Sequence, residues 1–132
     1  MIGTAYLDAS AAVKLLVNES ESSALTALLG SADLLISSEI LVVELGCFVD
    51  RSDDDRAAER RSRLLRQCDL VAFLPDVRER AAAPFTPPQR ALDAIHLATA
   101  LHLGFETLAF VSYDQQQLAA AKASGLSCLS PA

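Results

Sequence analysis

Short apolar runs typical of β-strands alternate with segments of helical periodicity along the whole chain, and this alternation constrains the fold most strongly. The predicted strands are residues 2–7, 33–37, 70–74, 108–112 and 127–129. The predicted helices are residues 9–17, 22–29, 39–49, 53–68, 76–83, 88–103 and 115–123. Strands separated by helices are joined by crossovers and form a parallel sheet covered on both faces. The pattern therefore predicts an α/β fold, a three-layer α/β/α sandwich with a mostly parallel central sheet.

The length of 132 residues predicts one domain, residues 1–132. Hydrophobic residues make up 52% of the chain, which argues against intrinsic disorder. The 3 cysteines lack metal-ligand spacing, and an odd count argues against a disulfide scaffold and for a reducing compartment. No run of about 18 apolar residues suggests a membrane span. We expect a cytoplasmic protein without a membrane partner.

The formal net charge of −6 excludes a protein that grips nucleic acid by bulk positive charge. Aromatic residues make up only 5% of the chain and Trp is absent, so a base-stacking surface is not expected. Any nucleic-acid chemistry must then come from a local site.

Two acidic residues follow predicted strands. Asp8 ends the first strand, where it is also well suited to cap the helix that follows. Asp114 ends the fourth strand, and its spacing to Gln117 matches a capping box. Taken singly, each has an ordinary structural explanation.

Two further acidic residues lie on predicted helices. Glu44 has apolar neighbours on its own helix, where an ionised carboxylate is costly unless it is paired; the alternative is a partly exposed side chain. Asp93 lies near a helix start, where the helix dipole would favour it. It adjoins an expected apolar face made of Leu92, Ile95, Thr99 and Leu103.

Taken together, the four carboxylates suggest a shared site, because the ends of parallel strands lie at one edge of a sheet. Carboxylates without basic partners repel one another and need a divalent cation, and oxygen ligands favour Mg²⁺ or Mn²⁺. Such a metal activates water and neutralises charge in phosphodiester hydrolysis. It would also bring a polyanion to an acidic protein.

At these residues the sequence resembles the PIN-domain ribonucleases, and within them the VapC toxins of toxin–antitoxin pairs. The matching stretches are YLDASAAVKLL, SSEILVVEL, ALDAIHLATALHLG, FVSYDQQQLAAA and GLSCLSP. They follow one another in the family's order over essentially the whole chain.

The resemblance implies an Mg²⁺- or Mn²⁺-dependent endoribonuclease that cleaves structured RNA such as tRNA or ribosomal RNA. It also implies a homodimer and a small VapB-type antitoxin that blocks the site. Asp8 and Asp93 match the principal metal ligands, Glu44 the third acid and Asp114 the more variable fourth. Ser10 and Ser112 match hydroxyl positions beside these acids.

Other polar residues near the expected site have both ordinary and functional explanations. His96 could reach the site, but a packed or hydrogen-bonded helix histidine is favoured, because a metal-bound water needs no histidine base. Lys14 and Arg90 could contact RNA phosphates, although solvated charges are favoured. Arginines 56, 60, 61, 63 and 66 could form an RNA-facing stripe, but interspersed acids favour a solvated face.

The 39–49 helix is apolar on nearly all sides, so it is either core or part of an antitoxin groove or dimer contact. Cys47 and Cys128 are expected to be small core residues.

Two other functions remain to be weighed. A phospho-acceptor domain is disfavoured, since Ala9 and Ser10 follow Asp8 in place of a second acid, and Tyr113 and Asp114 stand where a lysine would be needed. The second is a non-catalytic metal- or protein-binding module of the same fold, in which the acids only cap helices.

Overall fold

The computed structural model describes residues 2–104 and 106–132, and its centre is a five-stranded sheet in which every pairing is parallel. The strand order is β3-β2-β1-β4-β5. The strands are β1 (Thr4–Leu7), β2 (Leu34–Ser38), β3 (Asp69–Val71), β4 (Leu108–Val111) and β5 (Ser127–Leu129). The predicted α/β class is confirmed, and the sheet is wholly parallel among the described strands.

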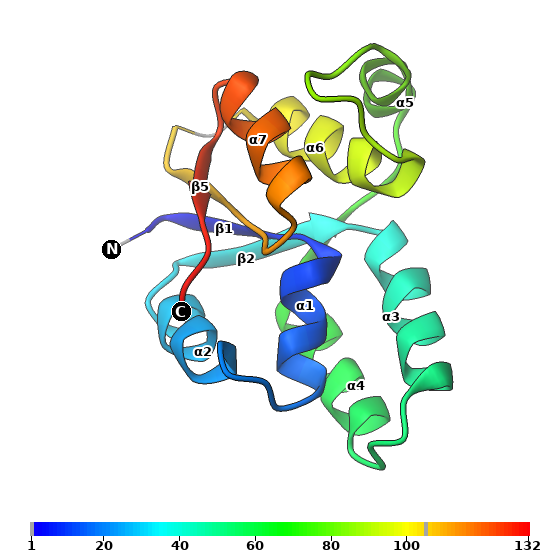
Figure 1. Ribbon diagram of the computed structural model, residues 1–132, viewed down its shortest axis with the longest axis vertical. Coiled ribbons are helices and arrows are strands. Elements are labelled where there is room, and N and C mark those ends of the chain that lie inside the picture. Colours follow the sequence, from blue (N-terminus) through cyan, green and yellow to red (C-terminus); the bar gives the residue numbers. More distant parts are fainter. Residues whose placement is uncertain (1, 105) are drawn as a thin grey trace.

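Helices cover both faces of this sheet, as Figure 1 shows. One layer holds α1 (Ala9–Leu16), α2 (Ser22–Gly30), α3 (Ile40–Arg51) and α4 (Ala57–Gln67). The other holds α5 (Pro75–Ala82), α6 (Ala91–Leu103) and α7 (Gln115–Ala123). This is the predicted three-layer sandwich.

Two hydrophobic cores follow from the alternation of side chains along the central strands. Tyr6 and Phe110 point to the α5–α7 side, where their rings stack at a centroid distance of 5.4 Å. Leu7 and Val111 point to the α1–α4 side. All residues of β1 and β4 are buried, which explains why these strands read as continuous apolar runs.

The topology places one opening at the carboxyl ends of β1 and β4. The chain leaves β1 for α1 on one face and leaves β4 for α7 on the other (Figure 1). Parallel sheets commonly bind ligands at such a switch point. Asp8 and Asp114, the N-cap residues of α1 and α7, therefore flank it.

Three predicted boundaries were wrong, each for a local reason. Pro88 does not open α6; Gln89 donates its side-chain amide to Gln116 O at 3.2 Å, which ties this loop to α7, and the helix begins at Ala91. Strand β3 ends at Val71 because its partner β2 ends at Ser38. Helix α4 begins at Ala57, since a turn around Asp54 precedes it.

The expected apolar face of α6 was wrong at its N-terminal end, although Thr99 is buried and Leu103 packs against the core as expected. Leu92 is 48% exposed, whereas the buried side of the helix is formed by Ala94, His96, Leu97, Ala98, Thr99 and Ala100. Small residues there let α6 pack closely on the sheet. At the other end, Gly104 terminates α6 as predicted, in a left-handed conformation with φ of 61°. Among the described residues, the helices are too short or too polar to cross a membrane.

Candidate acidic site

Asp8 is almost wholly buried, with 2% of its surface exposed, and its two carboxylate oxygens have different surroundings. Oδ2 accepts hydrogen bonds from the backbone N–H of Ser10 at 3.0 Å and from its hydroxyl at 2.6 Å, and Ser112 Oγ lies 3.1 Å away. Oδ1 is buried and has no hydrogen-bond partner within residues 2–104 and 106–132. The helix cap therefore uses one oxygen and leaves the other available.

Asp114 caps α7, as the sequence suggested, through a 3.0 Å hydrogen bond from Gln117 N to its Oδ1. Only half of the predicted capping box forms, because the buried Gln117 side chain turns elsewhere. Its Oε1 lies 2.9 Å from Ser112 Oγ, and its Nε2 donates to Asp93 O at 3.3 Å. Gln117 thereby joins the end of β4 to the first turn of α6.

Asp93 is half-buried in that first turn, and both this burial and the charges of the other three acids raise its pKa. Burial, followed by the charges of Asp8 and Asp114, raises the pKa of Asp93 to about 6; Glu44 adds to the shift and His96 opposes it. The charges of the other three acids thus act on Asp93, as expected if the four share a site.

Glu44 extends from α3 and is 15% exposed. Its Oε1 lies 2.6 Å from Nε2 of His96, a residue that is fully buried on α6. The other ring nitrogen, Nδ1, lies 2.8 Å from the hydroxyl of Tyr6 on β1. Burial opposes charge on His96, but the hydrogen bond to Glu44 and the charges of Asp8, Glu44 and Asp93 outweigh it and raise its pKa.

His96 is therefore the hydrogen-bonded core histidine that the sequence favoured, and its link to Glu44 is what sequence reasoning missed. The sequence did contain a signal for this pair. An acid on an apolar helix needs a partner, and His96 was one of the residues near the site able to supply it.

The four acids suit a divalent cation by their chemistry, but among the described residues their spacing does not form a coordination shell. Within residues 2–104 and 106–132, no three acidic, histidine or cysteine side chains stand together as a finished coordination shell. A cation would nevertheless pair with the unpartnered Oδ1 of Asp8 and would offset both the burial of Asp93 and the charges of Asp8 and Asp114, which together raise its pKa. Oxygen ligands of this kind suit Mg²⁺ or Mn²⁺.

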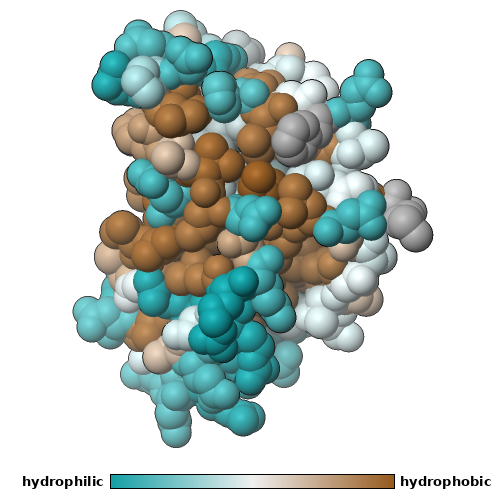
Figure 2. Space-filling model, turned by 180° about the vertical axis from the view of Figure 1, so that it is seen from behind, coloured by the Kyte–Doolittle hydropathy of each residue, from teal (hydrophilic) through white to brown (hydrophobic). Residues whose placement is uncertain are grey.

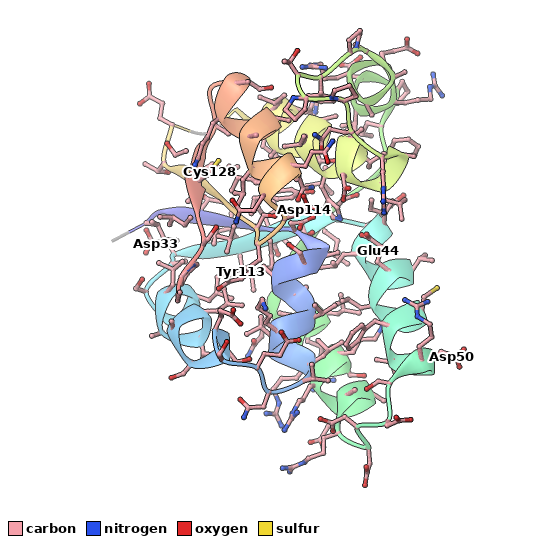
Figure 3. The ribbon with its side chains drawn as sticks, viewed as in Figure 1. Asp33, Glu44, Asp50, Tyr113, Asp114 and Cys128 are labelled. Carbon is pink, nitrogen blue, oxygen red and sulfur yellow. The ribbon has the colours of Figure 1, made fainter. Side chains whose placement is uncertain are left out.

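A pocket and a groove lie beside the acidic residues. A polar pocket of about 190 Å³ is lined by Pro88, Gln89, Arg90, Asp93, Asp114 and Gln116. A larger, apolar groove of about 620 Å³ runs between α1 and α3 and has Glu44 in its wall. The groove is lined mainly by Ala9, Val13, Ile40, Val43, Phe48 and Leu92. Figure 3 shows Asp114 and Glu44 near the N-terminal end of α1.

The basic residues fulfil their favoured roles only in part. Lys14 is not a solvated charge; its ammonium pairs with Glu19 at 2.8 Å and Glu21 at 3.0 Å and lies over the ring of Tyr113. Arg60 and Arg61 are half-buried and donate to the carbonyl oxygens of Leu16 and Val42. The exposed residues, as the favoured roles predicted, are arginines 56, 63 and 66 on α4 and its N-cap and Arg90 beside the polar pocket.

The cysteine expectation was half wrong. Cys47 is exposed in the apolar groove, whereas Cys128 packs against the core as expected. The 39–49 helix, expected to be apolar on nearly all sides, is only partly core, since Val43 is 67% exposed.

Comparison with known proteins gives matches over most of the chain. The family model described as "PIN domain" matches residues 5–127. The chain belongs to the PIN-domain family. Ribonuclease VapC46 of Mycobacterium tuberculosis is 37% identical over 127 residues, which cover 96% of each chain.

Solved structures share the fold of this chain at low sequence identity. The crystal structure of VapC20 from Mycobacterium tuberculosis, described as a sarcin–ricin loop cleaving toxin, has a TM-score of 0.73 and 16% identity, covering 96% of this chain and 99% of that one. A toxin–antitoxin complex from Klebsiella pneumoniae has a TM-score of 0.68 and 18% identity, covering 97% and 98%. The whole PIN fold is therefore present here.

Proposed function

We propose that this PIN-domain protein is an Mg²⁺- or Mn²⁺-dependent endoribonuclease that acts as the toxin of a toxin–antitoxin pair. The observation that carries the proposal is the buried Oδ1 of Asp8, unpartnered among the described residues, together with an Asp93 whose pKa is raised by burial and by the charges of Asp8 and Asp114. The identity of 37% to a protein named as a ribonuclease supports the same conclusion.

Asp8 and Asp93 are the proposed principal metal ligands, with Glu44 and Asp114 completing the set. When bound, the cation supplies Lewis-acid chemistry for hydrolysis of an RNA phosphodiester. Ser10 and Ser112 fix the Asp8 carboxylate through Oδ2 and so keep Oδ1 directed away from the helix cap. Asp114 is held in the same way by the Gln117 N–H.

The substrate is an RNA of the tRNA or ribosomal RNA class. Arg90 is exposed and offers hydrogen-bond donors beside Asp93 and Asp114 in the polar pocket, as binding of a backbone phosphate requires. With a net charge of −6, the protein needs this local site and its cation to hold a polyanion.

The proposed partners are a VapB-type antitoxin and a second copy of this chain, both in the cytoplasm. The Klebsiella pneumoniae neighbour is itself a toxin–antitoxin complex. The apolar groove beside Glu44 suits an antitoxin segment that combines apolar side chains with a basic one. Figure 2 shows a broad hydrophobic band on the face opposite that of Figure 1, which supports burial against another chain.

Induced expression in bacteria tests the toxin proposal. The wild-type chain is expected to arrest growth, whereas Asp8→Asn is not. Asp50→Asn is the matched control, because Asp50 is exposed on α3 and carries the same charge change (Figure 3). Equal arrest by all three proteins would favour a non-catalytic binding module of the same fold.

A further inference from the structure

A buried chain of hydrogen bonds connects the centre of the sheet to Glu44. Tyr6 lies in β1, fully buried, with its ring stacked on Phe110 at an interplanar angle of 11°. Its hydroxyl lies 2.8 Å from His96 Nδ1, and His96 Nε2 lies 2.6 Å from Glu44 Oε1. Both nitrogens of His96 are therefore engaged, one with the rigid sheet and one with the acid.

Glu44 needs such a restraint, because its position on α3 also allows side-chain rotamers that point away from the acidic site. The side chain forms part of the wall of the apolar groove, with Val43 and Cys47 exposed nearby on α3. A free glutamate has three rotatable side-chain bonds and would populate rotamers directed to solvent. The bond to His96 joins α3 to α6, the helix that also carries Asp93.

His96 donates the hydrogen bond to Glu44 whether its imidazole is neutral or charged. In the neutral ring, Nδ1 accepts the Tyr6 hydroxyl proton and Nε2–H donates to Glu44. In the charged ring, both nitrogens donate. A bare Nε2 would set its lone pair against a carboxylate oxygen 2.6 Å away, so the geometry requires a proton there.

We propose that His96, held in turn by the Tyr6 hydroxyl, is the positioning residue that keeps the Glu44 carboxylate at the acidic site. The inference rests on the proposed metal-dependent function, since it concerns how one of the proposed ligands is held. Hydrogen-bond partners of metal-binding carboxylates typically change metal affinity by about 10–100-fold when removed.

The proposal is tested by measuring the affinity of the protein for Mn²⁺ by isothermal titration calorimetry. His96→Leu would leave the buried Tyr6 hydroxyl without its partner and so endanger folding. The double variant Tyr6→Phe/His96→Leu removes both buried polar groups and keeps the core apolar. We expect it to fold and to bind Mn²⁺ about 10–100-fold more weakly.

Rescue separates positioning from packing. The amide nitrogen of Gln can take the place of His Nε2, so Tyr6→Phe/His96→Gln is expected to recover most of the Mn²⁺ affinity. Leu97→Val, a change at the neighbouring buried position on α6, controls for loss of packing and should leave the affinity unchanged. In a Glu44→Ala background, the Tyr6→Phe/His96→Leu change should not weaken Mn²⁺ binding further, because the carboxylate that His96 positions is absent.

A nuclear magnetic resonance signature accompanies these measurements. Of the 2 histidines, His102 is exposed and exchanges its ring protons rapidly, so a slowly exchanging imidazole N–H reports on His96. It should be present in the wild type and weakened by Glu44→Ala.

The two proposals fail differently. Wild-type affinity in the folded Tyr6→Phe/His96→Leu variant would overturn the positioning role and leave the metal site standing. Absence of Mn²⁺ binding by the wild type would overturn the proposed function and this inference together.

Discussion

Ser10 donates both its backbone N–H and its hydroxyl to the same oxygen of Asp8, Oδ2, at 3.0 and 2.6 Å. The other oxygen, Oδ1, remains buried without a partner in the part of the chain that the structure describes. One carboxylate can therefore cap α1 and still offer an oxygen to a cation. Helix capping and metal binding, which compete as explanations of Asp8 in the sequence, are compatible in the fold.

Removal of the Asp93 charge should stabilise the metal-free protein, and the gain should depend on pH. Because the pKa of Asp93 is about 6 in the folded chain and 3.8 as its ordinary value, the folded state binds the proton more tightly. The wild type therefore loses stability as pH rises from about 3.8 to about 6, whereas Asp93→Asn does not share that loss. Melting temperatures in EDTA should be higher for the variant than for the wild type at pH 7.5, and the difference should shrink at pH 5 and nearly vanish below pH 3.8. A difference that is the same at all three pH values would contradict the raised pKa of Asp93.

Binding of Mn²⁺ should stabilise the wild type by mass action. At a hundredfold excess over the dissociation constant the gain is about 2.7 kcal/mol, which raises the melting temperature of a domain of this size by roughly 10 °C. Asp93→Asn lacks a proposed ligand and should shift much less. An equal shift in both proteins at saturating Mn²⁺ would show that Asp93 is not a principal ligand.

The two roles of Asp114 can be separated by the choice of substitution. Ser is as good an N-cap as Asp, so Asp114→Ser should keep the stability of α7 in EDTA. Asp114→Ala loses the hydrogen bond from Gln117 N and should cost about 1 kcal/mol by urea unfolding. Both variants remove the carboxylate and should weaken Mn²⁺ binding. If only the alanine variant bound Mn²⁺ more weakly, Asp114 would be a cap alone.

The sequence predicted the fold well wherever one residue decides a local structure. Gly104 ends α6 because only glycine readily adopts its φ of 61°, and the buried runs of β1 and β4 mark central parallel strands. The start of α6 was missed because the contact of Gln89 with Gln116, residues far apart in sequence, fixes the preceding loop.

The sequence predicts which acids form the candidate site, but it does not predict their hydrogen-bond partners. Asp8 and Asp114 follow strands, so topology alone places them at one edge of the sheet. The pairing of Glu44 with His96 joins two helices whose relative placement no local pattern specifies. The exposure of Cys47 likewise depends on which side of α3 packs against the core, and a helix that is apolar on nearly all sides does not specify that side.

Cleavage of RNA by the purified protein in Mg²⁺ or Mn²⁺, compared with Asp8→Asn and Asp50→Asn, tests the central claim most directly. Asn retains the helix cap at position 8, so a loss of activity there reports on the carboxylate itself. Loss of a metal ligand should reduce the rate by about a hundredfold or more. The account predicts discrete fragments from the wild type and Asp50→Asn, lost with EDTA and with Asp8→Asn. Cleavage that persists in EDTA, or that is unchanged in Asp8→Asn, would contradict it.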